Sequence, residues 1–143
     1  MTRNKNRIYI AFFARPGHDN FHTAILVTPK NPKPNENTSW QLHVINRPDT
    51  SRANQEEWVY NPQQTDSRTS RLMALILLGK TEVNGPELSE MLGAVEVVQD
   101  VSNWNCTSWT LSAVQASLPL PPGSDPLIVM RKLLFTSAFL VYA

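Results

Sequence analysis

The sequence predicts an α+β domain in which an antiparallel sheet of about three to six strands packs against a helix that bears the single cysteine. The first half of the chain alternates short β-rich segments with turns rich in Pro, Gly and Asn. The second half contains segments with helix start and stop signals. With 143 residues, 41% of them hydrophobic, we expect one domain over residues 1–143 with its core in about residues 8–117.

Four strands are expected in the first half, at residues 8–14, 21–28, 39–46 and 57–60. The first follows a basic start and is apolar, but it is short and no small-residue cleavage pattern follows it, so a strand is favoured over a signal peptide. The second is apolar on both faces, as in a central strand. A loop rich in Pro and Asn separates the second strand from the third, and Pro62 follows the fourth.

In the second half, residues 71–78 fit a strand or a helix, and the segment that follows them favours a strand. We further expect a strand at 95–99, a short helix at 85–93, and the cysteine helix between Asn103 and the breaker-rich residues 119–123. Pro and Glu at the start and Gly at the end indicate the short helix.

The C-terminal segment is apolar, but Arg131 and Lys132 interrupt it. They leave only about ten uninterrupted apolar-rich residues, too few to cross a bilayer. A buried final helix over about residues 125–142 is therefore expected in place of a membrane contact.

The charge balance argues against a nucleic-acid partner. The formal net charge is +1, and the basic residues are scattered along the chain. A single cysteine cannot form an internal disulfide, which favours a reducing compartment such as the cytoplasm or a functional thiol. Three histidines and one cysteine without close spacing do not form a metal-binding motif, so neither a metal nor another cofactor is expected.

Cys106 is the candidate nucleophile. With Asn103 as N-cap, Cys106 falls in the first turn of its helix, where free backbone N–H groups and the helix dipole favour a thiolate. The thiolate is the nucleophilic form of cysteine, so this position is chemically useful if a histidine reaches it. The alternative is a small core residue, because free cysteine is among the most buried residue types.

Two histidines are positioned to reach the thiol. If the second and third strands form an antiparallel hairpin, Thr28 lies opposite Ser39 and His22 lies opposite Ile45. His43 is then on the same face as His22, one diagonal step away, with Cβ atoms about 7–8 Å apart. One ring can take the thiol proton while the other orients it. A slip of one residue would move His43 to the opposite face, and both rings would then be ordinary core or edge histidines.

Four further residues are candidates for substrate binding. His18, in a turn, can line the same cleft, and Asn105 flanks the cysteine. Trp104 and Trp109 are the tryptophans best placed to form the wall of a pocket.

Three segments together resemble the permuted papain-like superfamily: residues 21–27 (FHTAILV), 42–45 (LHVI) and 105–109 (NCTSW). The superfamily includes the lecithin:retinol acyltransferase relatives, and the chain is more loosely similar to the PPPDE isopeptidases. The layout most closely resembles small uncharacterised fungal proteins with an Asn-Cys-x-x-Trp helix. The resemblance covers about residues 8–117. The acyltransferase relatives usually have Glu-His after the cysteine, where this chain has Thr107 and Ser108, and a shorter loop between the two histidines.

The resemblance implies that Cys106 is the nucleophile, His22 the general base and His43 the orienting residue. The expected function is a cysteine-dependent hydrolase or acyltransferase acting on an amide, ester or thioester of a small molecule or peptide. The backbone N–H of Cys106 is the expected oxyanion donor. Two alternatives stay open: a non-catalytic protein that binds a ligand or partner, and a cyclase-like biosynthetic enzyme that uses Cys and His for acid–base chemistry.

Overall fold

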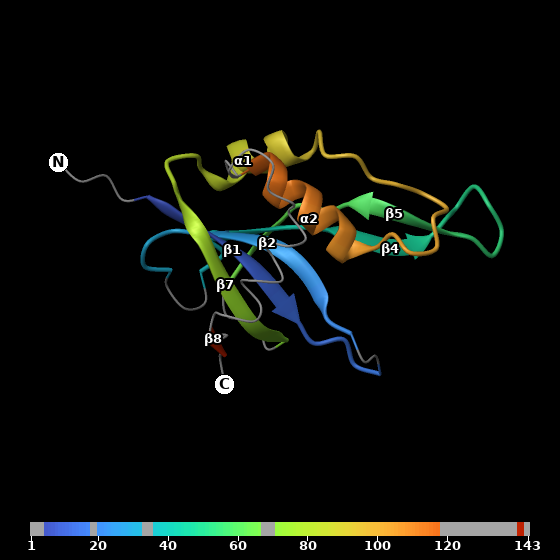
Figure 1. Cartoon of the computed structure of the whole chain (residues 1–143), viewed down its shortest axis with the longest axis horizontal. Coiled ribbons are helices and arrows are strands. Elements are labelled where there is room, and N and C mark those ends of the chain that lie inside the picture. The colour runs from blue at the N-terminus through green and yellow to red at the C-terminus, as the bar shows by residue number, and fades with distance from the viewer. Residues whose placement is uncertain (1–4, 18–19, 33–35, 67–70, 118–139, 142–143) are drawn as a thin grey trace.

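A computed structural model of the chain describes residues 5–17, 20–32, 36–66, 71–117 and 140–141 (Figure 1). The strands are β1 (Asn6–Phe13), β2 (His22–Thr28), β3 (Ser39–Leu42), β4 (Val44–Pro48), β5 (Glu56–Tyr60), β6 (Gln63–Thr65), β7 (Leu72–Thr81) and β8 (Leu140–Val141). The helices are α1 (Gly85–Leu92) and α2 (Cys106–Ser117). One sheet has the order β6-β3-β2-β1-β7-β8, and β4 and β5 form a second, two-stranded sheet. The pairings described are antiparallel, which confirms the predicted α+β class.

The predicted central strand is confirmed. β2 lies between β1 and β3, and every residue after His22 in it is buried. Its odd-numbered apolar residues join the core cluster that includes the helices, and its even-numbered ones join a second cluster on the opposite face. Because both faces are covered, the strand has no polar side.

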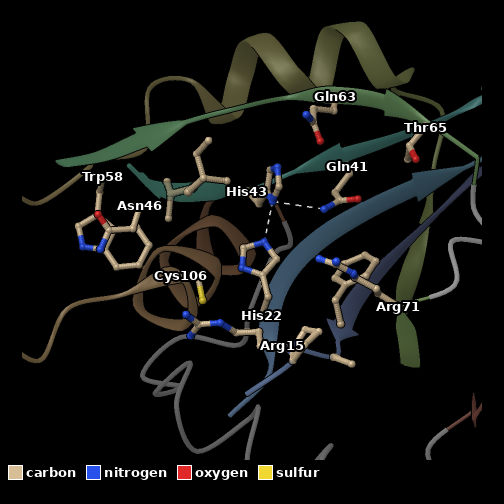
Figure 2. A pocket seen from close by; sticks show the side chains of 15 residues that line it. Arg15, His22, Gln41, His43, Asn46, Trp58, Gln63, Thr65, Arg71 and Cys106 are labelled. Carbon is tan, nitrogen blue, oxygen red and sulfur yellow. Dashed lines mark hydrogen bonds between the residues drawn. The ribbon is translucent and has the colours of Figure 1, made fainter. Parts of the chain in front are cut away.

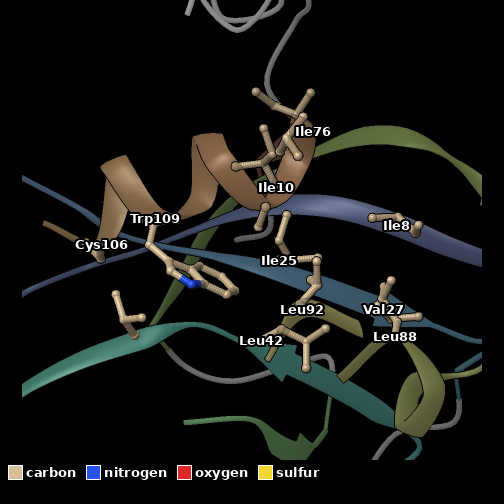
Figure 3. Packing of buried hydrophobic residues seen from close by; sticks show 13 residues of the cluster. Ile8, Ile10, Ile25, Val27, Leu42, Ile76, Leu88, Leu92, Cys106 and Trp109 are labelled. Atoms are coloured by element: carbon tan, nitrogen blue, oxygen red, sulfur yellow. The ribbon is translucent and has the colours of Figure 1, made fainter. Parts of the chain in front are cut away.

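The larger core lies between the sheet and the two helices (Figure 3). In α2 the buried residues are Cys106, Trp109, Thr110, Ala113 and Val114, which follow the spacing of a single helix face. The side chain of Trp109 is fully buried, and its ring centroid is 5.3 Å from that of Tyr60. Cys106 is the first member of this buried stripe, so packing of α2 turns its side chain toward the sheet.

The predicted third strand is interrupted at His43. Its first half is β3, which pairs with β2, and its second half is β4, which pairs with β5 in the other sheet. The predicted hairpin register is confirmed, since Leu26 pairs with Gln41 and Val27 with Trp40. The prediction of one continuous strand was wrong. Apolar residues flank His43 and are buried whether the strand is continuous or interrupted, so the apolar pattern of the sequence does not reveal the break. The unpredicted β6 pairs with the other edge of β3.

The prediction of a strand at residues 95–99 is also wrong. Instead of backbone pairing, the Gln99 side chain accepts a hydrogen bond from the Trp58 N–H (2.9 Å) and donates one to the Trp58 carbonyl (2.7 Å). A side-chain amide therefore takes the place of a strand partner. The predicted strand at 71–78 is confirmed as β7, and the predicted helix at 85–93 as α1.

The predicted C-terminal helix falls mostly outside the described residues. Its described end, Leu140–Val141, is a strand paired with β7, so the helical prediction is wrong there. None of the described helices is long and apolar enough to span a membrane.

Gly85, at the start of α1, gives the first test of the packing. A Cβ atom at this position would overlap Cδ1 of the Trp40 ring. We expect Gly85→Ala to lower the free energy of unfolding by about 1–3 kcal/mol, because the ring has to move within a packed core. Urea denaturation measures the difference. The control is Glu90→Ala, at an exposed position of the same helix, and a Gly85→Ala chain as stable as the wild type would contradict this packing.

Candidate active site

The cap of α2 places Cys106 at the first position of the helix. The side-chain oxygen of Asn105 accepts hydrogen bonds from the N–H groups of Thr107 (2.9 Å) and Ser108 (3.3 Å). In return, the Ser108 hydroxyl accepts one from the Asn105 N–H (3.1 Å). The N-cap is therefore Asn105, and the prediction of Asn103 was wrong by two residues. This reciprocal cap does not use the Cys106 N–H, which makes no hydrogen bond to the described part of the chain.

Two threonine contacts fix the start of α2 against β2. The Thr23 hydroxyl lies 3.3 Å from the hydroxyl of Thr107 and 3.3 Å from that of Thr110. The Thr110 hydroxyl also donates to the Cys106 carbonyl at 2.7 Å. The position of the cysteine relative to the first residues of β2 is thus set by side chains on both elements.

The environment of the Cys106 thiol favours the thiolate. Only 5% of the residue is exposed, and this burial by itself raises the pKa of the thiol. Hydrogen bonding to the His22 side chain and to the Thr23 backbone outweighs the burial and lowers the pKa from 9.0 to about 7. Near neutral pH, a substantial fraction of Cys106 is therefore in the nucleophilic form.

The two histidine rings are in direct contact. Nε2 of His22 lies 2.6 Å from Nδ1 of His43, and the ring centroids are 4.9 Å apart (Figure 2). The Gln41 amide nitrogen lies 3.2 Å from the same Nδ1, and an amide NH₂ only donates. Nδ1 of His43 is therefore the acceptor, and Nε2 of His22 carries the proton. Nδ1 of His22, which can take the thiol proton and then donate to the thiolate, is on the side of the ring that faces Cys106 (Figure 2).

Burial keeps His43 neutral. Burial and repulsion from His22 lower its pKa from 6.5 to about 4, although a hydrogen bond with the Gln63 side chain raises it. The Asn61 backbone N–H donates to the His43 carbonyl at 2.8 Å. The neutral His43 ring can therefore accept a hydrogen bond from His22, and it does not compete with His22 for the proton of the thiol.

Two hollows meet at Cys106. Their volumes are about 650 Å³ and 680 Å³, and both are lined by Arg15, Asn46, Trp58 and Cys106. The first extends over the two histidines, and the second extends along the start of α2. The sulfur, although mostly buried, is therefore at the bottom of a cleft.

The comparisons with known proteins identify one family. A family model described as a family of unknown function (DUF6914) matches residues 5–118. The chain belongs to this family. The match includes β1 to β7, α1 and α2, and with them the site. Neither a curated protein nor a solved structure matches the chain.

In this DUF6914 domain, Cys106, His22 and His43 lie together although they are far apart in the sequence. Asn105 lines the second hollow, but its side-chain oxygen caps the helix. His18 lies outside the described residues. Among the described residues, no group of three His, Cys, Asp or Glu side chains is placed to bind a metal ion.

The expectation that Trp104 or Trp109 forms the pocket wall requires correction. Trp109 is fully buried in the core, and Trp104 packs edge-on against Trp58 at a centroid distance of 5.8 Å without lining either hollow. Trp58 is the tryptophan that lines both hollows. The helix spacing from Cys106 to Trp109 places both side chains on the buried face, which is why Trp109 faces the core.

Sequence reasoning missed the residues Arg15, Gln41, Asn61 and Gln63. Gln41 could have been found, because it is two residues before His43 and a strand repeats its faces every second residue. Arg15 is two residues after Phe13, which pairs with His22, so a predicted β1–β2 register would have placed Arg15 close to His22. Asn61 and Gln63 lie at or beside the unpredicted β6 and had no comparable signal.

Because the pKa of Cys106 is lowered, we predict that its alkylation begins at a lower pH than that of an ordinary cysteine. The rate of reaction with iodoacetamide should rise with pH around a midpoint of about 7, because the thiolate is the reacting form. His22→Asn should move this midpoint up toward 9.0, the ordinary value, by removing the main hydrogen bond. Intact mass measured at a series of pH values gives both curves. Gln64→Ala, which lines neither hollow, is the control, and a thiol that reacts only after denaturation would contradict the assignment.

The lowered pKa of His43 predicts a loss of stability in acid. The unfolded chain takes up a proton below about pH 6.5, but the folded chain does so only near pH 4. Stability from this group is therefore complete above pH 6.5 and falls as the pH drops to 4, by on the order of 3 kcal/mol. Urea denaturation across this range should show a smaller fall for His43→Gln.

Asp49→Asn is the control for that series. Hydrogen bonds from Ser51 and Arg52 lower the pKa of Asp49 from 3.8 to about 2, so its protonation changes the stability mainly below pH 4. Parallel curves for His43→Gln and the wild type would show that His43 is not buried as a neutral ring.

Proposed function

We propose that this DUF6914 domain is a cysteine-dependent hydrolase or acyltransferase that acts on an amide, ester or thioester. The observation that carries the proposal is that Cys106, His22 and His43 line one cleft, with the His22 ring between the sulfur and His43 and hydrogen-bonded to His43 (Figure 2). A nucleophile, a base and an orienting group in series are the recurring parts of covalent acyl transfer.

The order of these parts also supports a permuted papain-like fold. The histidine is on β2, which precedes the helix that bears the cysteine at its start. An antiparallel sheet packed against that helix fits the same arrangement. We therefore propose this fold for the domain as well.

In the first half-reaction, Nδ1 of His22 takes the proton of the Cys106 thiol, and the sulfur forms a bond to the carbonyl carbon. The π electrons of the carbonyl move to its oxygen, which becomes an oxyanion. The backbone N–H of Cys106 is available for this oxygen at the positive end of α2. When the carbonyl re-forms, the bond to the leaving group breaks, and the leaving group takes the proton from His22.

In the second half-reaction, water or an acceptor hydroxyl or amine attacks the thioester carbon. His22 removes the proton of the attacking group, and the carbon–sulfur bond breaks to release the acyl product. The sulfur leaves as the thiol, with the proton returned by His22. Hydrolysis and transfer differ only in the identity of the attacking group.

His43 acts as a positioning residue. Its neutral Nδ1 accepts a hydrogen bond from the Nε2–H of His22, which fixes the tautomer that leaves Nδ1 of His22 free for the thiol. Gln41 donates to the same Nδ1 and keeps it an acceptor. Removing His43 should therefore slow the reaction less than removing His22.

An acyl-enzyme trap tests the proposal. The chain is mixed with 4-nitrophenyl acetate, and its intact mass is followed together with the release of nitrophenolate. We expect a burst and one acetyl group on Cys106, removable by neutral hydroxylamine, because a thioester forms. Cys106→Ala should abolish both signals, His22→Asn should slow acylation by about 10²-fold or more, and Gln64→Ala should match the wild type.

Acetylation confined to lysines, or absent from Cys106, would overturn the proposal. That result would favour a ligand-binding protein or an enzyme that uses Cys106 and His22 only for acid–base chemistry. Adding glycerol or a small amine to the acetylated chain then separates transfer from hydrolysis, since only a transferase forms the acetylated acceptor in preference to acetate.

A further inference from the structure

The cleft around Cys106 contains arginines but no described acidic side chain. Arg15 lines both hollows and Arg71 lines the first, whereas neither hollow is lined by an Asp or a Glu that the structure describes. Two groups of ion pairs, Arg47 with Glu57 and Arg52 with the carboxylates of Asp49 and Asp100, involve residues that line neither hollow. The cleft is therefore positively charged within the part of the chain that the structure describes.

Backbone pairing fixes the strand ends from which these arginines project. Arg15 follows the end of β1, where Phe13 pairs with His22. Arg71 precedes β7, and its carbonyl accepts a hydrogen bond from the Ala14 N–H at 2.8 Å. In Figure 2 the guanidinium of Arg15 is on the Cys106 side of His22, and that of Arg71 is on the other side. The two groups thus flank the proposed base.

The hydrogen bonding of Arg15 leaves it able to bind an anion. Its Nη1 donates to the side-chain oxygen of Asn20 at 3.1 Å, and this acceptor is uncharged. A guanidinium has five N–H donors in a fork that matches two oxygens of a carboxylate or phosphate. Arg15 is half-buried, which strengthens its interaction with an anion compared with a fully exposed arginine.

The two hollows differ in their arginines, because Arg15 lines both and Arg71 lines only the first. Both hollows also have polar and apolar side chains: the first includes Gln41, Gln63 and Thr65, and the second includes several Asn, Ser and Thr side chains beside Phe12, Phe21 and Leu111. An anionic group fits the first hollow, because it is the one of the two that both arginines line.

We propose that the substrate carries an oxyanion, either a carboxylate or a phosphate, which binds in the first hollow to Arg15 and Arg71 while the scissile carbonyl lies over Cys106. The position of the carbonyl rests on the proposed function. The binding of the anion rests on the arginines and the polar lining of the hollow.

Iodoacetate and iodoacetamide provide matched probes, because both alkylate the same sulfur with loss of iodide and differ in carrying a carboxylate or a neutral amide. The ratio of their rate constants cancels changes in the thiolate fraction and in access to the sulfur. We expect this ratio to be about tenfold higher for folded Cys106 than for the same chain in urea, and to fall as sodium chloride is added. Intact mass measures both rates.

Arg15→Gln and Arg71→Gln should each lower the ratio by about threefold or more, because each removes one cation beside the carboxylate. Arg47→Gln is the matched control, since it removes an exposed arginine outside both hollows. Inorganic phosphate and glutarate are then tested for protection of Cys106 against iodoacetamide. Protection that is lost in Arg15→Gln supports the proposal, and the more effective anion identifies the group. Protection by neither anion overturns it.

The outcomes separate this inference from the proposed function. In one outcome, Cys106 reacts fast with iodoacetamide while the ratio does not increase on folding and does not change in Arg15→Gln or Arg71→Gln. That result overturns the anion site and leaves the assignment of Cys106 as the nucleophile unchanged. A folded chain in which Cys106 is inert to iodoacetamide overturns the proposed function, and the inference with it.

Discussion

The packing of the first turn of α2 against the start of β2 brings the reactive groups together. Thr23 contacts threonines on the helix, and the buried stripe of α2 directs Cys106 toward the sheet. His22 is the neighbour of Thr23, so the same contact that aligns the helix also positions the ring beside the thiol. The position of the sulfur relative to the imidazole therefore depends on how these two elements pack.

The break at His43 is the second structural requirement. Because β3 ends at Leu42 and β4 joins another sheet, His43 lies at a junction where the side chains of Gln41, Asn61 and Gln63 surround it. Gln41 belongs to β3, which ends just before His43, whereas Asn61 follows β5 and Gln63 belongs to β6. The junction therefore brings side chains from three segments around a buried, neutral acceptor for His22.

Much of the fold and part of the site could be predicted from the sequence. The strand register followed from apolar segments separated by a Pro-rich loop, and this register by itself places His22 near His43. The strand break, β6 and the role of Gln99 depend on contacts between distant segments, which local patterns do not record. Arg15, which follows β1, and Trp58, in β5, join the site only through the way these strands are arranged in space, so residue type and spacing did not single them out.

The central claim is that His22 donates from Nε2 to His43 and leaves Nδ1 free for Cys106. Nitrogen NMR of the chain labelled with ¹⁵N in its histidines measures this arrangement directly. We predict a proton on Nε2 of His22, a scalar coupling from that nitrogen to Nδ1 of His43, and a His43 ring that stays neutral down to about pH 4. A His22 ring without a proton on Nε2 at neutral pH, with no coupling between the two rings, would contradict the account.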